Sequence, residues 1–121
     1  MDFTIEGKNL MLAALSGMTA ALYTGADYVN DEVTGGEPGE EYARQPVSFQ
    51  PAANGQRLID DAALPLFNIP ASTGVTHGAI FIGTARIAEG PVVNEQFNAS
   101  GTYRLSAETL LRLLDISEVT P

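Results

Sequence analysis

The chain has no cysteine and no tryptophan, one histidine, and only six lysine and arginine residues. The absence of cysteine excludes disulfides, thiolate metal sites and cysteine nucleophiles. The six basic residues stand against fifteen acidic ones, so the formal net charge is −9. Such a charge is repelled by phosphate backbones and by anionic lipid surfaces. We therefore expect the chain to bind neither nucleic acid nor a membrane.

Long apolar runs are also missing. The most apolar stretch, residues 10–23, contains serine, glycine and threonine and is shorter than the roughly 20 residues that a bilayer span needs. No basic segment with a clean cleavage site precedes it, as a signal peptide would require. We expect neither a membrane-spanning helix nor a signal peptide.

Recognisable catalytic motifs are missing as well. The sequence contains no G-x-S-x-G motif, so His77 has no nearby nucleophile to activate. Alternation predicts that His77 lies half-buried on a strand, on the face that carries Val75, Ala79 and Phe81. We expect its ring to hydrogen-bond to a nearby carbonyl. The acidic stretch "DYVNDEVTGG" does not match the spacing of a calcium loop, and no glycine-rich phosphate-binding motif is present. We expect no catalytic residue, no metal, no cofactor and no enzyme.

What is present suits one globular domain over residues 1–121, with 45% hydrophobic residues. A short helix is predicted over about residues 7–16, capped by Asn9 and ended by Gly17. Its apolar stripe must dock on the rest of the chain, because so short a helix is not stable alone. The stripe consists of Leu10, Met11, Ala14 and Leu15.

The remainder reads as short strands separated by glycine and proline clusters. Strands are predicted over residues 18–24, 42–49, 63–69, 75–83 and 85–93, and Asn54-Gly55 predicts a type I′ hairpin turn. Leucines at both helical and strand spacing leave residues 106–115 open between the two structures. The fold class predicted is mainly β, an antiparallel β-sandwich or jelly-roll-like domain with one short N-terminal helix.

A long acidic loop is predicted over about residues 25–41, because glycines and like charges keep this stretch solvated. The strand that follows alternates, with Val47 and Phe49 on the inward face and Tyr42 and Arg44 on the other. Pro46 has no N–H to donate, which indicates an edge strand.

This edge is the best candidate for a partner interface. Arg44 either offsets the acidic loop beside it or holds a carboxylate of a neighbouring subunit in a bidentate fork. Tyrosine and arginine are enriched at interfaces, so we name as candidate interface residues Tyr42, Arg44, Tyr28, Glu40 and Glu41.

Several stretches, read in order, are similar to a family of small structural proteins of tailed bacteriophages, usually labelled tail-fibre or minor structural proteins. They are "TAALYTG", the acidic loop, "EEYARQPVSF", "LPLFNIPASTGVTHGAIFIG" and "GTYRLSAETLLRLLD". The resemblance covers about residues 18–115, and "YARQPVSF" and "VTHGAIF" are its most specific parts. The chain departs from the family where "IGTARIAEG" follows the aromatic residue. The resemblance implies a β-sandwich, favours a strand within residues 106–115, and supports no enzyme.

Within that class we expect a capsid decoration or minor capsid protein, because a fibre would need shaft repeats or heptads that the chain lacks. The expected partners are the major capsid protein or other virion proteins and further copies of the chain, on a virion assembled in the bacterial cytoplasm. Two alternatives remain: a tail-fibre or minor tail protein that contacts the host surface, and a carbohydrate- or ligand-binding β-sandwich module.

Overall fold

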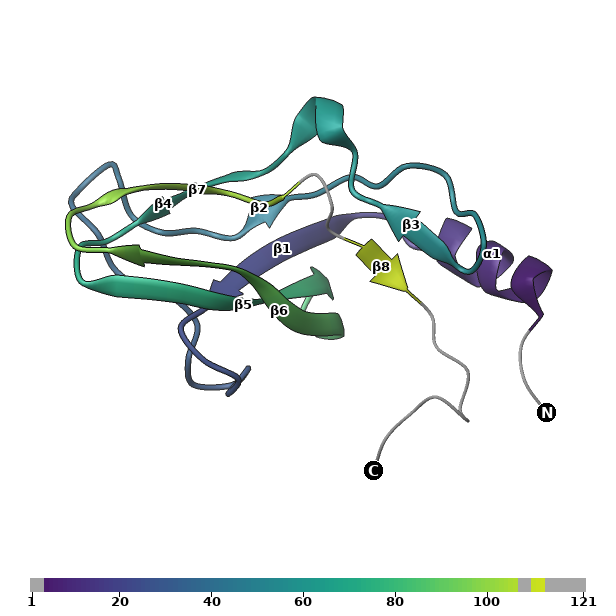
Figure 1. Cartoon of the computed structure of the whole chain (residues 1–121), viewed down its shortest axis with the longest axis horizontal. Helices are drawn as coiled ribbons and strands as arrows, with labels where there is room; N and C mark the ends of the chain where they lie inside the picture. Colours follow the sequence, from purple (N-terminus) through teal and green to yellow (C-terminus); the bar gives the residue numbers. More distant parts are fainter. Residues whose placement is uncertain (1–3, 107–109, 113–121) are drawn as a thin grey trace.

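A computed structural model describes residues 4–106 and 110–112 of the chain. The chain begins with a helix, α1 (Ile5–Ala13), and then forms mostly strands (Figure 1). The strands are β1 (Met18–Tyr23), β2 (Gln45–Pro46), β3 (Gln56–Leu58), β4 (Leu66–Ile69), β5 (Thr73–Ile82), β6 (Ala85–Phe97), β7 (Gly101–Arg104) and β8 (Leu110–Arg112), with a 3-10 turn η1 (Asp61–Ala63) before β4. No helix in the described residues is long and apolar enough to cross a membrane.

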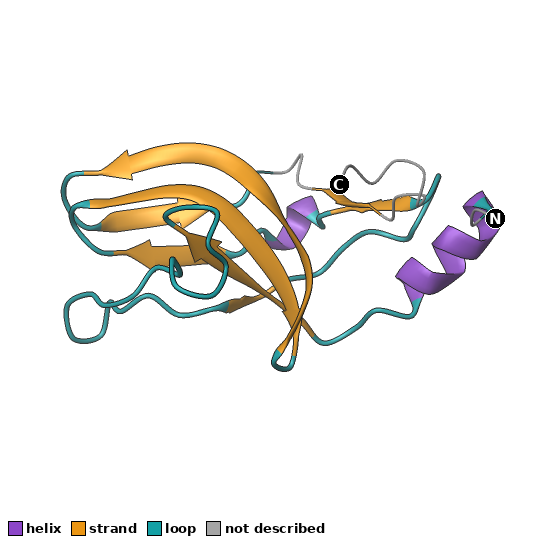
Figure 2. Ribbon diagram, turned by 90° about the horizontal axis from the view of Figure 1, so that it is seen from below, coloured by secondary structure: helices purple, strands orange, loops and turns teal. Residues whose placement is uncertain are grey.

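All strand pairs are antiparallel. One four-stranded sheet has the order β2-β1-β5-β6, and two smaller pairs are formed by β4 with β7 and by β3 with β8. The curved strands occupy one part of the molecule and α1 lies at the opposite end of its long axis (Figure 2). The predicted fold class, mainly β and antiparallel with a short N-terminal helix, is confirmed.

The main core lies between the four-stranded sheet and the β4–β7 pair. Alternate residues of β1, among them Leu22, face this core together with Ile80 of β5. From the other side, β4 contributes Phe67 and its partner β7 contributes Tyr103, and both side chains are almost fully buried. Because sequence-distant strands supply the two sides, the core exists only when the whole chain has folded.

The helix differs from its prediction. It begins at Ile5 rather than near residue 7, and its N-cap is Thr4, whose hydroxyl accepts a hydrogen bond from the Gly7 amide. Asn9 lies inside the helix and its side chain instead accepts from the backbone amide of Gly55. The predicted docking stripe was wrong as well: Leu12 is buried, whereas the Leu10 side chain is exposed.

The predicted hairpin turn is confirmed and holds the helix. Asn54 and Gly55 both have positive φ angles, 54° and 74°, as a type I′ turn requires. A Cβ at Gly55 would come within 2.9 Å of the Lys8 side chain, so glycine lets α1 lie directly on the turn. The turn therefore sets the geometry of the hairpin and the position at which α1 packs on it.

The stretch 42–49 is less regular than predicted. Only Gln45 and Pro46 form a strand, which pairs with β1 at the edge of the four-stranded sheet, as the proline indicated. Val47 and Phe49 are buried, as expected. Alternation fails at Tyr42, since the backbone before Gln45 is not in the ladder and the phenol ring turns inward onto the core.

The sequence left residues 106–115 open between helix and strand, and the structure decides this for part of them. Residues 110–112 form a strand that pairs with β3, and residues 107–109 and 113–115 lie outside the described residues. The strand β7, which had no prediction of its own, pairs with β4 along its whole length.

Candidate functional site

The outer face of the four-stranded sheet, away from the main core, carries a second group of packed side chains. Tyr23 of β1 and Phe81 of β5 are its buried centre, and Tyr28 from the acidic loop packs against them. Two arginines, each with a glutamate, lie over these rings. We call this set the aromatic–arginine cluster: Tyr23, Tyr28, Glu32, Arg44, Phe81, Arg86 and Glu89.

Arg44 is bound within its own chain. Its Nε and Nη2 donate to the two carboxylate oxygens of Glu32 at 2.9 and 2.7 Å, and its guanidinium lies 3.9 Å from the centre of the Phe81 ring. The fork predicted for Arg44 is therefore present, but the carboxylate that it holds belongs to the acidic loop. The hydrogen bonds from Arg44 hold the pKa of Glu32 below its ordinary value of 4.5.

Arg86, which the sequence did not single out, makes a similar arrangement on the other side of the cluster. Its Nε donates to Glu89 at 2.9 Å, and its Nη1 donates to the carbonyl oxygen of Tyr28 at 3.3 Å. Its guanidinium lies 5.4 Å from the centre of the Tyr28 ring. No local signal pointed to Arg86, because its contact with Tyr28 joins residues 58 positions apart.

Tyr42 supports the cluster from below and does not face outward, which corrects its predicted orientation. Its hydroxyl donates to Glu32 at 2.9 Å and accepts from the Leu22 amide at 2.9 Å. Its ring stacks on Phe67 of the main core, with centroids 6.2 Å apart. Burial raises the pKa of Tyr42 above its ordinary value of 10.0, so the hydroxyl stays protonated and keeps both bonds.

Tyr28 and Tyr23 form the aromatic centre of the cluster. Their rings meet edge to face with centroids 5.0 Å apart, and the Tyr28 ring also lies 6.0 Å from that of His77. The Tyr23 hydroxyl is fully buried and has no hydrogen-bond partner among the described residues. It is the one buried side-chain polar atom in that part of the chain left in this state.

The loop that carries Tyr28 is shaped by its own acids. Asp27 accepts hydrogen bonds from the Asn30 side-chain amide at 2.9 Å and from the Val29 and Asn30 backbone amides, both at 3.0 Å, and these bonds lower the pKa of Asp27. Val33, further along, is buried in the main core, and its amide donates to the Leu22 carbonyl. The predicted loop is thus solvated over residues 34–41 but docked on β1 just before them.

Glu40 and Glu41 do not join the cluster through any contact in the described residues. Both are exposed, and Glu41 accepts a hydrogen bond from the Gly39 amide at 3.0 Å, which shapes the tip of the loop. Of the five predicted interface residues, the structure therefore brings Arg44 and Tyr28 into one surface cluster, with Tyr42 beneath it.

His77 lies on the outer face with two of the three neighbours that alternation predicted, and Val75 is the exception. A register shift in the pairing of β5 with β6 separates it from Val75, so Val75 enters the main core while His77 stays beside Ala79 and Phe81. Its Nδ1 lies 2.7 Å from the Thr76 hydroxyl, where a backbone carbonyl had been predicted. The residue is half-buried, as expected.

Ion pairs and ring contacts within the chain hold the charged side chains of the cluster. Its two carboxylates are held by arginines, and the described residues contain no group of three His, Cys, Asp or Glu side chains placed to hold a metal. No protein-family model matches the chain, and no curated protein or solved structure is significantly similar to it.

Proposed function

We propose that the protein is a structural component of a tailed-phage virion, a decoration or minor capsid protein that binds the assembled shell. Binding only the assembled state stabilises that state by mass action. The observation that carries the proposal is the aromatic–arginine cluster, in which Tyr28, Arg44 and Arg86 lie at the surface over the buried rings of Tyr23 and Phe81 and are held by internal contacts. The phage assignment itself rests on the sequence resemblance described above.

The composition of the cluster suits a protein interface. Tyrosine, phenylalanine and arginine are enriched at the centres of such interfaces. The arginines are held by Glu32 and Glu89, so few side-chain rotations are lost when a partner binds, which lowers the entropic cost of association. The Arg44 side chain is still 38% exposed and can contact a partner while it remains paired.

The expected partner is the major capsid protein or another virion protein, repeated around the symmetry axes of the shell together with further copies of this chain. The net charge of −9 keeps the protein away from packaged nucleic acid and suits a position on the outer side of the shell. A tail position is the runner-up, and the location of the chain in the virion separates the two.

A carbohydrate-binding role receives less support. A polar hollow of about 180 Å³ is lined by Glu40, Asn68, Ile69, Ser100, Gly101 and Thr102. Sugar sites usually stack the apolar face of the ring on an aromatic side chain, and none lines this hollow. We therefore do not propose this role.

The proposal is tested by a charge swap that separates folding from partner binding. Arg44→Glu places two carboxylates together and should lower both stability and incorporation into virions. The double variant Arg44→Glu with Glu32→Arg restores an internal pair but reverses the surface, so it should recover stability without recovering incorporation. Incorporation is measured by quantifying the chain in purified virions. Wild-type incorporation of the stable double variant would remove this surface from the contact.

The matched control is Arg86→Glu with Glu89→Arg, which reverses the second ion pair of the same cluster. If both swaps reduce incorporation, the contact covers the cluster; if only one does, the contact is centred on that pair. A chain that is folded and yet absent from virions in its wild-type form contradicts the proposal.

A further inference from the structure

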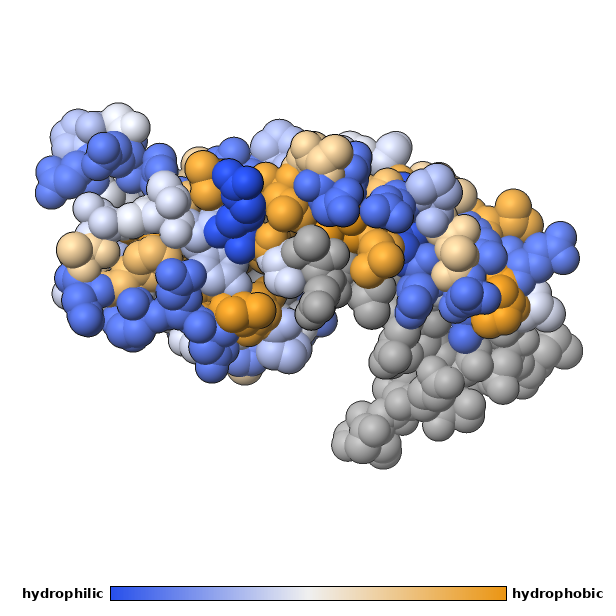
Figure 3. Space-filling model, turned by 45° about the horizontal axis from the view of Figure 1, so that its top comes forward, coloured by the Kyte–Doolittle hydropathy of each residue, from blue (hydrophilic) through white to orange (hydrophobic). Residues whose placement is uncertain are grey.

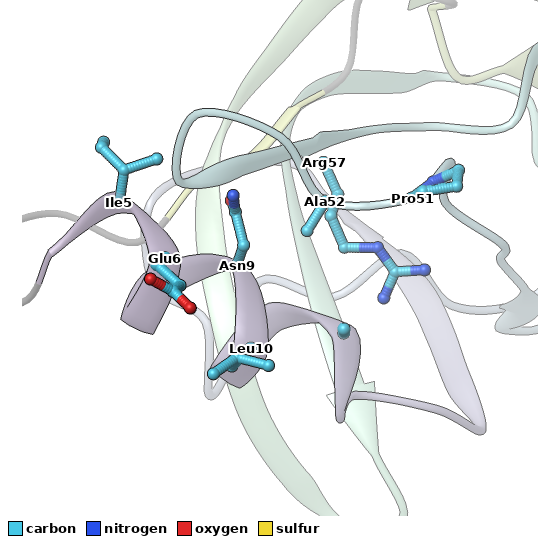
Figure 4. Close-up of a pocket in the computed structure, with 8 residues that line it drawn as sticks. Ile5, Glu6, Asn9, Leu10, Pro51, Ala52 and Arg57 are labelled. Atoms are coloured by element: carbon cyan, nitrogen blue, oxygen red, sulfur yellow. The ribbon is translucent and has the colours of Figure 1, made fainter.

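A second surface, at the opposite end of the molecule from most of the sheet, has a different character. Between α1 and the loop before β3 lies a hollow of about 640 Å³ (Figure 4). The Ile5, Glu6, Asn9 and Leu10 side chains line it from the helix, and Pro51 and Ala52 line it from the loop. Ala13 and Arg57 complete it. We call this surface the helix hollow.

The apolar side chains of the helix hollow are unusually accessible. Leu10 is 69% exposed and Ile5 is 51% exposed, on a helix of only nine residues. The space-filling view shows orange, apolar side chains among blue ones at this end of the molecule (Figure 3). Exposed apolar side chains that gather beside a hollow are typical of a binding surface.

The charges of the helix hollow are also unmatched. Arg57 donates to the carbonyl oxygens of Leu12, Leu15, Phe49 and Gln50, which fixes the end of the helix, but no carboxylate of the described residues lies within 4.0 Å of it. Glu6 likewise has no basic partner in the described part of the chain. One acid and one base therefore line the same hollow, and within the described residues neither forms an ion pair.

We propose that the helix hollow is a two-fold interface with a second copy of this chain. In a two-fold interface, if one residue of the first copy contacts another residue of the second copy, the same pair is in contact with the copies exchanged. A surface that holds one acid, one base and two exposed apolar side chains can pair with a second copy of itself. The α1 helices of the two copies lie antiparallel, the Leu10 side chain of each enters the apolar part of the facing hollow, and Glu6 of each approaches Arg57 of the other.

This interface does not depend on the virion role. It shares no residue with the aromatic–arginine cluster and leaves that cluster free to contact another protein. A protein with one surface for its own copy and another for a different partner can be repeated in pairs on a larger assembly.

The test is the mass of the isolated protein in solution, measured by sedimentation equilibrium up to about 1 mM at physiological salt. The mass of the wild-type protein should rise from 12.8 kDa toward twice that value with concentration. Leu10→Glu should weaken the association at least about tenfold. The matched control Val93→Glu adds the same charge at another exposed apolar residue, 64% exposed on β6, and should associate like the wild type.

A charge variant probes the ionic part of the interface. Glu6→Arg places like charges at both ends of the two-fold contact and should weaken the association several-fold, with a loss that shrinks at high salt. A wild-type protein that stays monomeric over the whole range overturns the inference, as does a dimer that Leu10→Glu leaves unchanged. If the wild-type protein is a monomer and enters virions but the Leu10→Glu variant does not enter them, another protein occupies the hollow. This outcome overturns the inference and leaves the proposed function standing.

Discussion

The aromatic–arginine cluster and the helix hollow differ in how their charges are satisfied. In the cluster, Arg44 and Arg86 each hold a glutamate of the same chain. In the hollow, Arg57 is bound only by backbone carbonyls, and Glu6 has no basic partner in the described residues. The charges of the first surface are neutralised within the chain, whereas in the described residues Arg57 and Glu6 of the second have no ion-pair partner.

The difference shows that a conspicuous residue and an available residue are not the same. Arg44 and Tyr42 stand out in the sequence, yet most of their polar atoms bind groups of the same chain. Because the side chains of such a surface are already ordered, a partner that binds it loses less conformational entropy. The hollow offers exposed apolar side chains, and burying these favours association more directly.

The largest expected effect is at the hollow. Arg57→Ala removes the donors that bind four backbone carbonyls, so α1 should detach from the sheet and the free energy of unfolding should fall by about 3 kcal/mol. Denaturant unfolding measures the loss, and far-UV circular dichroism reports the helix. Arg104→Ala, at an exposed position on β7, is the control and should change stability by less than about 0.5 kcal/mol. Equal losses in the two variants would show that Arg57 does not hold the helix.

A smaller effect is expected beneath the cluster. Tyr42→Phe leaves the Leu22 amide without its acceptor and Glu32 without one donor, which should cost about 2 kcal/mol of stability. Tyr28→Phe removes a hydroxyl for which no hydrogen bond is found in the described residues, and should cost less than about 0.5 kcal/mol. If the two variants unfold at the same denaturant concentration, Tyr42 is not the support that the structure shows.

The pH dependence of the cluster follows from Glu32. Its pKa is lower in the folded chain than in the unfolded one, so the stabilisation from its ion pair is complete above pH 4.5 and is lost as the pH falls through the folded value. The side chain is partly exposed, and water screens the pair, so the loss should not exceed about 1 kcal/mol. Unfolding curves of the wild type and Glu32→Gln should therefore converge at acid pH. A stability difference between the two proteins that does not change with pH would show that the ionised pair makes no contribution.

The smallest effect concerns the Tyr23 hydroxyl. Because this group is buried without a partner in the described residues, Tyr23→Phe should leave stability within about 0.5 kcal/mol of the wild type or raise it. A loss greater than about 1 kcal/mol would mean that the hydroxyl is bonded, with a buried water as the simplest partner. Thermal unfolding of the two proteins at neutral pH distinguishes these outcomes.

Local signals in the sequence predicted the local features of the fold. Asn54-Gly55 predicted its turn, Pro46 predicted a sheet edge, and alternation predicted the burial of Val47 and Phe49. Each of these depends on a few neighbouring residues, whose backbone preferences are strong.

The features that the sequence did not predict depend on distant contacts. The register shift that moves Val75 into the main core arises from pairing with β6, and the strand β7 exists because β4 lies beside it. The helix start was misplaced because Asn9, a good cap by type, is used by the Gly55 amide. The candidate site was found in part: Arg44 and Tyr28 were named, but Arg86 and its contact with the Tyr28 carbonyl join parts of the chain that no sequence pattern connects.

The most direct test of the proposed role is to collect virions from cells that carry the gene for this chain and to locate its density by cryo-electron microscopy. The proposal predicts copies on the outer side of the capsid, with the aromatic–arginine cluster against a neighbouring virion protein. Density confined to the tail, or virions that lack the chain, would contradict it.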